Sequence, residues 1–294
     1  FKFFDYISFI IIRSFYSLSY FRNKVGHKKT KDVEENLFFN VSLSKNKLVD
    51  SLIEKGHSDI FVLKKDLQNK LLNEILINLK NSIITTKENS TYKDQIKFYK
   101  KDDVGQYLIN NNVHIIKSNI DFKSSNILKK IFVNDFFISL AKDYLNTDKL
   151  TIVPQFHISS NNDNKNDFNK INELNSSAAQ EYHFDVDFKK FFKIFVYFSD
   201  VLEAEQGAHI FIPTTHRKKE IENILPSRFK TTDIHKTYGK TKTFLGEKGT
   251  VFMVDTFGIH KGSPIKKGVR MSLILEFGKD HFPCDANYGN CTYI

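Results

Sequence analysis

The sequence predicts an α+β protein in which N-terminal helices pack on one sheet of an antiparallel sandwich or barrel such as a jelly roll. Three observations predict this fold: apolar stripes at helical spacing in the first half, many short apolar strands in the second half, and turn-forming residues between those strands. The 294 residues can hold one large domain or two small ones, with a sizeable core. The hydrophobic fraction of 40% and the aromatic fraction of 14% fit a globular protein rather than a disordered one.

An apolar segment opens the chain at residues 1–22, "FKFFDYISFIIIRSFYSLSYFR". Arg13 and several serines interrupt it, so it does not fit a spanning helix, and it shows no signal-cleavage pattern. We expect an amphipathic helix, either docked on the domain or in peripheral contact with a membrane surface. Residues 23–294 are then expected to form a single domain.

The spacing of apolar residues predicts that the chain is mainly helical up to about residue 148. Leu48, Val49, Leu52 and Ile53 fall at helical spacing, and Gly56 stands where a C-terminal cap would. Two longer stripes also predict helices; they consist of Leu67, Leu71, Leu72, Ile75, Leu76 and Leu79, and of Ile127, Leu128, Ile131, Phe132, Phe136, Leu140 and Tyr144. The run "DIFVL" at Asp59–Leu63 is consistent with a short strand.

Short runs rich in Val, Ile, Phe and Tyr dominate residues 149–278, the expected jelly-roll core. They read "LTIVPQFHI", "EYHFDVDF", "FKIFVYFSDV", "AHIFIP", "GTVFMVD" and "VRMSLILEFG". Glu205-Gln206-Gly207 and Lys267-Gly268 supply turns between them. The Asn-rich stretch from Ser159 to Ala178 is predicted to be a long loop, and we expect it to act as a lid because it leads directly into His183.

The charge and the cysteine content limit which binding partners and which cellular compartment we expect for the protein. The formal net charge is +10, but the lysines are spread along the chain in short clusters, so we expect no nucleic-acid partner. The two cysteines, Cys284 and Cys291, are too few for a disulfide framework or a Cys-rich zinc site. We expect free thiols in a reducing compartment, and hence a cytoplasmic protein; a single bridge between them is the alternative.

A candidate metal site begins in "QEYHFDVDF", which is predicted to be a strand from Gln180 to Phe188. His183 and Asp185 lie two residues apart, so both side chains would project from one face. The third ligand must come from elsewhere, and His260, just after the strand "GTVFMVD", is the candidate. Two histidines and one carboxylate form the facial triad of non-haem iron(II) oxygenases, which leaves coordination positions open.

Arg270 is a candidate binding residue for an anionic co-substrate, and it stands at the start of the predicted strand "VRMSLILEFG". A planar guanidinium binds a carboxylate through two hydrogen bonds, as the distal end of a dicarboxylate such as 2-oxoglutarate requires. Lys193 and Tyr197 share one strand face, where a co-substrate contact and a structural role are both open. Asp187 is expected to lie outside the ligand set, and His157 is expected to be a core or edge histidine.

These residues carry a resemblance that covers roughly Thr151 to Gly278. The segments "AQEYHFDVDFKKFFKIFVYFSDVLEAEQGAHIFIPTTHR" and "GTVFMVDTFGIHKGSPIKKGVRMSL" resemble the phytanoyl-CoA dioxygenase family of iron(II)/2-oxoglutarate-dependent oxygenases. The family pattern is H-x-D, an acidic turn with Gly, a Pro-Gly-Ser-His-like element, a His often followed closely by Ser, and a final Arg. The third element departs from this pattern, because it reads Pro213-Thr214-Thr215-His216 here.

The resemblance implies a double-stranded β-helix (jelly-roll) core and an oxygenase that oxidises a small-molecule C–H bond. It implies that iron(II) is bound by His183, Asp185 and His260, and that 2-oxoglutarate is bound by Arg270 with Ser263 nearby. The intact carboxylate favours hydroxylation or another oxidation over halogenation. The alternatives are a cupin-like metal enzyme without 2-oxoglutarate and a non-catalytic binding module. No signature in the sequence fixes the substrate or the oligomeric state.

Overall fold

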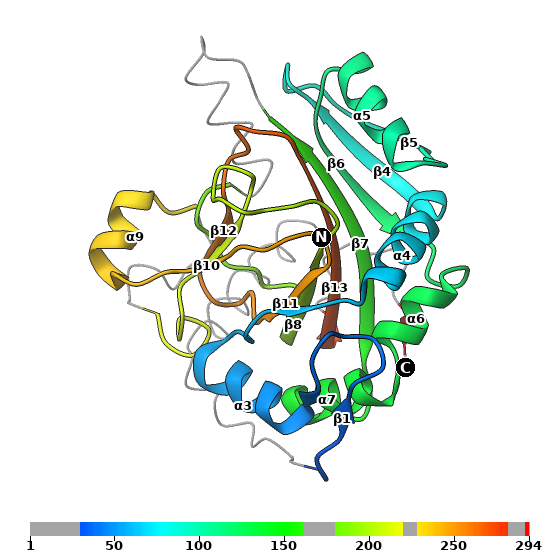
Figure 1. Ribbon diagram of the computed structural model, residues 1–294. Helices are drawn as coiled ribbons and strands as arrows, with labels where there is room; N and C mark the ends of the chain where they lie inside the picture. The colour runs from blue at the N-terminus through cyan, green and yellow to red at the C-terminus, as the bar shows by residue number, and fades with distance from the viewer. Residues whose placement is uncertain (1–29, 162–179, 220–227, 282–291, 294) are drawn as a thin grey trace, which may run out of the picture.

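Helices and strands alternate along the first half of the chain, and strands dominate the second half (Figure 1). The structure is a computed structural model that describes residues 30–161, 180–219, 228–281 and 292–293. The helices are α3 (Lys45–Lys55), α4 (Lys65–Ile77), α5 (Lys101–Asn110), α6 (Asn126–Phe132), α7 (Asp135–Leu145) and α9 (Thr231–Tyr238). The expected helix at 1–22, residues 162–178 of the expected lid, and both cysteines lie outside the described residues. Ser159 and Ser160, expected to begin that loop, are instead the last residues of β7.

The strands form two main sheets, all of whose pairs are antiparallel. They are β3 (Phe61–Val62), β4 (Leu79–Thr86), β5 (Thr91–Asp94), β6 (Val113–Ile120), β7 (Thr151–Ser160), β8 (Phe188–Tyr197), β9 (His209–Phe211), β10 (Lys242–Phe244), β11 (Thr250–Val254), β12 (His260–Gly262), β13 (Val269–His281) and β14 (Thr292–Tyr293). The nine-stranded major sheet has the order β3-β11-β8-β13-β7-β6-β4-β5, with β14 beside β7. The minor sheet has the order β10-β9-β12, and β1 (Glu34–Glu35) pairs with β2 (Leu43–Ser44) separately.

One face of the major sheet packs in the hydrophobic core and the other carries polar residues, and the central strand β13 shows this most clearly. One face of β13 is buried in the main hydrophobic core against the helices, through Met271, Leu273, Leu275 and Phe277. The other face alternates with it and carries Arg270, Ser272, Ile274 and Glu276. Burying a leucine such as Leu273 contributes about 1.5–3 kcal/mol relative to leaving it exposed.

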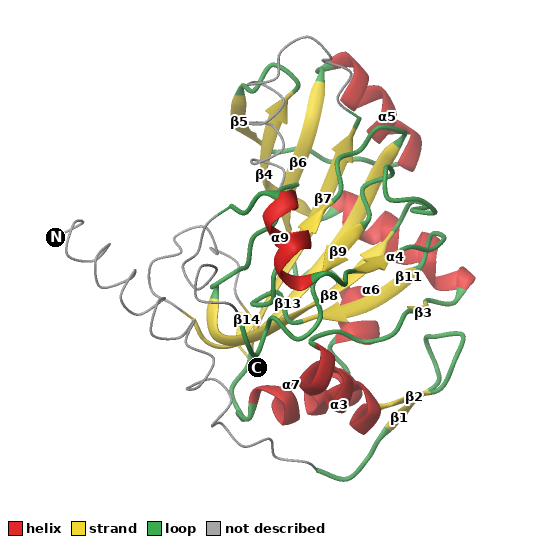
Figure 2. Ribbon diagram, turned by 90° about the vertical axis from the view of Figure 1, so that its left-hand side faces the viewer, coloured by secondary structure: helices red, strands yellow, loops and turns green. Residues whose placement is uncertain are grey.

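The helices cover the core face, and the minor sheet with α9 lies on the other side (Figures 1 and 2). Residues of α3, α4, α5, α6 and α7 all belong to the main core. A second cluster joins the two sheets, with Phe195 and Phe252 from the major sheet and Phe211 and Phe244 from the minor sheet. This arrangement agrees with the predicted fold class of a jelly-roll core with helices packed on one sheet.

The cap predicted at Gly56 is confirmed, and it anchors α3. The Ser44 side chain accepts a hydrogen bond from the Lys47 N–H at the start of α3, and the Gly56 N–H donates to the Leu52 carbonyl at its end. Gly56 has a φ of +83°, and a Cβ there would lie 2.5 Å from Nδ1 of His216. Glycine is therefore required both for the backbone conformation and for the close approach of His216.

Three expectations about the elements need correction. The helical first half also contains β4, β5 and β6, which extend the major sheet from β7; "VHIIKSNI" is a short apolar run in which helix and strand are not separable by pattern. The stripe ending at Leu79 is cut at Asn78, so Leu79 opens β4. The stripe from Ile127 to Tyr144 is two helices, because the Asn134 side chain caps a new one by accepting from the Phe137 N–H.

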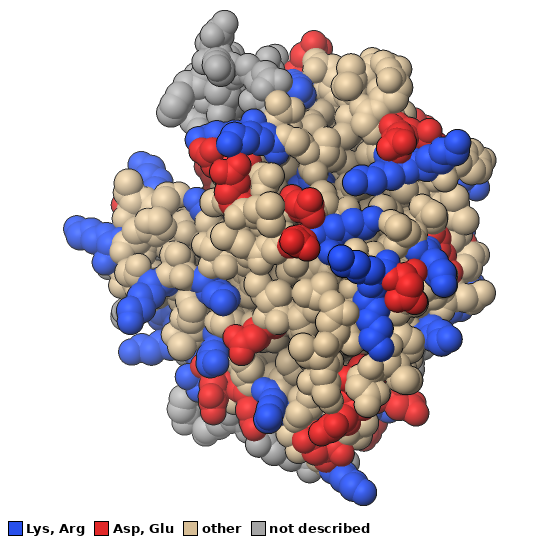
Figure 3. Space-filling model, in the orientation of Figure 1, with Lys and Arg blue, Asp and Glu red and all other residues tan. Residues whose placement is uncertain are grey.

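The surface in Figure 3 shows lysine and arginine side chains interspersed with aspartate and glutamate rather than gathered in one stripe. Exposed ion pairs such as Lys266–Glu205 and Lys267–Glu203 belong to this mixed pattern. In the described parts of the chain, no helix has the length and apolar character needed to span a membrane.

Candidate metal and co-substrate site

His183 and His260 are held side by side by backbone hydrogen bonds. The His183 N–H donates to the His260 carbonyl at 2.9 Å, and the His260 N–H donates to the His183 carbonyl at 2.8 Å. Two residues further, the Asp185 N–H donates to the Thr256 carbonyl at 2.9 Å. The expected strand from Gln180 to Phe188 is therefore wrong in extent: the segment forms isolated bridges from His183 to His260 of β12 and from Tyr182 to Phe229, and β8 begins only at Phe188.

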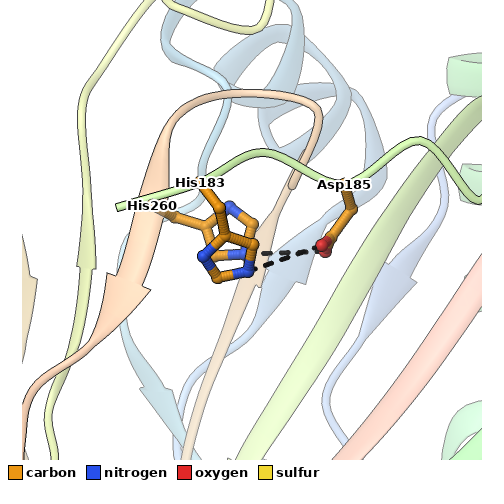
Figure 4. A group of neighbouring side chains, drawn as sticks. All are labelled: His183, Asp185 and His260. Atoms are coloured by element: carbon orange, nitrogen blue, oxygen red, sulfur yellow. Dashed lines mark ion pairs between the residues drawn. The ribbon is translucent and has the colours of Figure 1, made fainter. Parts of the chain in front are cut away.

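The three expected ligands lie within reach of one metal ion (Figure 4). Their ligand atoms all lie within 4.8 Å of one another. The Asp185 carboxylate is 3.6 Å from Nε2 of His183 and 3.5 Å from Nε2 of His260. The two imidazole rings lie beside each other with centroids 4.3 Å apart.

Backbone carbonyls orient both imidazoles toward the carboxylate. Nδ1 of His183 is 2.8 Å from the Glu181 carbonyl, and Nδ1 of His260 is 2.9 Å from the Gly258 carbonyl. Because a carbonyl only accepts, these contacts keep the proton on Nδ1 and leave the Nε2 lone pair available. This is the arrangement in which histidines usually bind metals.

The charge states also suit a cation. Burial and the neighbouring His260 lower the pKa of His183 to about 3, and burial lowers the pKa of His260, so both rings are neutral near pH 7. Burial alone would raise the pKa of Asp185, but the Lys193 ammonium and the two imidazoles hold it below its usual range. Two neutral imidazoles and one carboxylate are the donor set of the facial triad, so these residues fit a divalent metal.

A cavity of about 150 Å³ opens beside this group. Its wall comes from β7, β8, β9, β12 and β13 together with the segment of His183 and Asp185. The lining residues are Gln155, His157, His183, Asp185, Lys193, Phe195, Tyr197, His209, His260, Gly262, Arg270, Ser272 and Ile274. Of the seven residues predicted for the site, six line this cavity.

Ser263 does not line the cavity. Successive side chains alternate along a strand, so His260 and Gly262 face the cavity and Ser263 falls out of that row. Its N–H donates to the Ala208 carbonyl at 2.8 Å.

The Lys193 ammonium is paired with carboxylates on the Asp185 side of the cavity and is not directed toward Arg270. Its Nζ is 2.8 Å from Asp185 and 2.9 Å from Asp187, with Glu276 at 3.7 Å. Burial and the nearby Asp187 carboxylate raise the pKa of Glu276 well above its usual value. Asp187 thus lies outside the ligand group and shares Lys193 with Asp185.

Tyr197 has its hydroxyl engaged by the backbone of the minor sheet. The hydroxyl accepts from the His209 N–H at 2.9 Å and donates to the Phe244 carbonyl at 3.3 Å. Burial raises the pKa of Tyr197 to about 12. These contacts tie β8 to β9 and β10, so the side chain forms a structural part of the cavity wall.

Arg270 reaches into the cavity without a carboxylate partner among the described residues. Its Nη1 donates to the Gly207 carbonyl, and its Nη2 lies 3.4 Å from Oγ of Ser159. Its Nε is buried and has no hydrogen-bond partner in the described part of the chain. A buried guanidinium in this condition is poised for an anion.

Seven of the lining residues were not among those predicted for the site, and three of these bear on its chemistry. His209 and Ser272 each present a buried side-chain atom, Nε2 and Oγ, with no partner in the described residues. His157, expected in the core or at an edge, lies in the cavity wall. A signal existed for Ser272, which stands two residues after Arg270 and so shares its strand face.

No protein-family model matches the chain, and no curated protein matches its sequence. Among solved structures, the fold is similar to "the non-heme alpha ketoglutarate dependent epimerase SnoN from nogalamycin biosynthesis", with TM-score 0.50 and 10% identity over 84% of this chain and 86% of that chain. It is also similar to EctD from S. alaskensis with bound Fe, with TM-score 0.50 and 12% identity over 87% of this chain and 85% of that chain. At such identities these similarities show the fold, and they confirm the predicted jelly-roll class.

Proposed function

We propose that this protein is an iron(II)- and 2-oxoglutarate-dependent oxygenase of the phytanoyl-CoA dioxygenase type, which oxidises a C–H bond of a small molecule. Arg270 carries the proposal, because its guanidinium lines the same cavity as His183, Asp185 and His260 and has no carboxylate partner in the described residues. A 2-oxo dicarboxylate has a metal-chelating end and a distal carboxylate, and so matches both parts of the cavity. The fold shared with SnoN, described as alpha-ketoglutarate dependent, supports this class.

The roles of the side chains follow from their chemistry. Iron(II), when bound, would supply the O2 activation and one-electron chemistry that C–H oxidation needs. His183, Asp185 and His260 would hold it on one side and leave positions open for co-substrate and O2. Arg270 would bind the distal carboxylate through two N–H groups and fix the orientation of the chelating end.

Binding measurements under anaerobic conditions test the proposal directly. Iron(II) and then 2-oxoglutarate are titrated into the protein by calorimetry, and succinate release is measured in air with candidate small-molecule substrates. Arg270→Met should weaken 2-oxoglutarate binding by about 2–5 kcal/mol, roughly thirty- to several-thousand-fold, and leave iron affinity unchanged. Arg270→Lys keeps the charge but loses the two-point contact, so its affinity should lie between those of the wild type and Arg270→Met.

The outcomes separate the alternatives. Binding of iron without 2-oxoglutarate would favour a cupin-like metal enzyme, and binding of neither would favour a non-catalytic module. The nature of the product, an alcohol or another oxidation, follows from mass spectrometry of a turned-over substrate. Deletion of residues 1–22 should leave 2-oxoglutarate-dependent activity intact if residues 23–294 are the whole oxygenase domain.

A further inference from the structure

His209 is the first residue of β9, and aromatic rings surround its imidazole. Its ring centroid lies 4.6 Å from that of Phe195 and 5.7 Å from that of Phe252. It also stacks on His260, with centroids 5.2 Å apart and planes 19° apart. Its backbone N–H donates to the Tyr197 hydroxyl. The ring is thereby fixed in place, and only 6% of the residue is exposed.

His209 is a polar residue in these mainly apolar surroundings. Its Nε2 is buried and has no hydrogen-bond partner among the described residues. An imidazole has at least one N–H, and the unpartnered Nε2 can carry it and donate a hydrogen bond. An unsatisfied buried polar atom destabilises the folded protein, and a phenylalanine in the same aromatic surroundings would not carry this penalty. A ligand in the cavity would supply the missing partner.

Arg270 connects His209 to the anion side of the cavity. Both residues line the cavity, and Nε of Arg270 is the second buried nitrogen there without a partner in the described residues. Arg270 also donates to the carbonyl of Gly207, two residues before His209, so its guanidinium is fixed to the turn that leads into β9. Two nitrogen donors that line one cavity are groups from which the two oxygens of a single carboxylate accept hydrogen bonds.

We propose that His209 donates a hydrogen bond from Nε2 to the same distal carboxylate that Arg270 binds, and so makes the cavity selective for 2-oxo dicarboxylates over 2-oxo monocarboxylates. This inference rests on the proposed function, and it assigns His209 as a specificity-determining residue. The N–H is then on Nε2, and Nδ1 carries the lone pair. Contact with the metal is not required, since the metal-binding group consists of His183, Asp185 and His260.

A pair of ligands isolates the distal carboxylate. With iron(II) bound and O2 excluded, the affinities for 2-oxoglutarate and for 2-oxopentanoate, which has the same carbon chain without that carboxylate, are measured by calorimetry. His209→Phe should weaken 2-oxoglutarate binding roughly ten- to hundredfold and change 2-oxopentanoate binding less than about twofold. His209→Gln retains an N–H donor and should recover most of the affinity. His209→Leu gives a second apolar variant if the phenylalanine variant does not fold.

Iron affinity and thermal unfolding of each variant separate this role from a structural one. In the Arg270→Met background the effect of His209→Phe should shrink, because both residues act on one carboxylate. Equal weakening of both ligands, a loss of iron affinity, or unchanged 2-oxoglutarate binding in all His209 variants would each overturn the assignment. If the wild-type protein with iron bound takes up no 2-oxoglutarate, the proposed function fails and this inference fails with it.

Discussion

Gly207 lies where the turn before β9 meets the Arg270 side chain, and Gly207→Ala should weaken both folding and co-substrate binding. Its φ is +87°, a region in which an alanine costs about 1–2 kcal/mol. A Cβ would also lie 2.7 Å from Cγ1 of Ile265 and 3.2 Å from Cδ of Arg270. Relieving such contacts in a packed region costs about 1–3 kcal/mol more, so the total should be about 2–5 kcal/mol.

Gly268→Ala is the matched control. Gly268 has a φ of +74°, but a Cβ there would meet nothing within 4 Å. It should therefore lose only the backbone part, about 1–2 kcal/mol. Urea unfolding measures both free energies, and calorimetry with iron(II) bound measures 2-oxoglutarate affinity, which should fall for Gly207→Ala because the Arg270 anchor shifts. Equal destabilisation by the two substitutions would refute the packing argument.

Three further predictions concern metal binding and stability. Asp185→Ala should lower iron(II) affinity at least roughly a hundredfold, measured by chelator competition, and an unchanged affinity would exclude a ligand role. Lys45 and Asp143 form a buried ion pair at 2.5 Å, so Lys45→Met should cost about 3–5 kcal/mol in urea unfolding, and the double variant Lys45→Met/Asp143→Leu should recover most of it. Burial lowers the pKa of His57 in the folded protein below its ordinary value of 6.5. As the pH falls below 6.5, the unfolded chain therefore binds a proton at His57 before the folded protein does, and the free energy of unfolding should decrease. The slope from this residue is at most about 1.4 kcal/mol per pH unit, and His57→Phe should remove it; an identical slope in the variant would contradict the argument.

The sequence predicts local features well where one residue has one physical role. Gly56 marks the end of α3 because no other residue suits its backbone angle, and the alternation in "VRMSLILEFG" predicts both faces of β13. The H-x-D spacing brings His183 and Asp185 together even though the segment is not a regular strand, because its pairing with β12 keeps it extended.

Other features depend on partners that the sequence does not reveal. Whether "VHIIKSNI" is a helix or a strand depends on its pairing with β7, and the position of Ser263 depends on the register of β12 with β9. His209 escaped prediction because its importance lies in what surrounds it. A histidine in "AHIF" gains meaning only once Phe195, Phe252 and Arg270 lie around the same cavity.

The alternation along β13 has a consequence for how the site can change. One strand supplies Arg270 and Ser272 to the cavity and Leu273 and Leu275 to the core, in strict turn. Inserting or deleting one residue within it would carry the guanidinium into the core and leucines into the cavity, so folding and chemistry would be lost together. Substitution at Ser272 or Ile274 leaves this register intact. The central strand therefore permits a change of lining but not a change of length, and new specificities on this scaffold should arise by replacement there and by insertion in the loops at the rim.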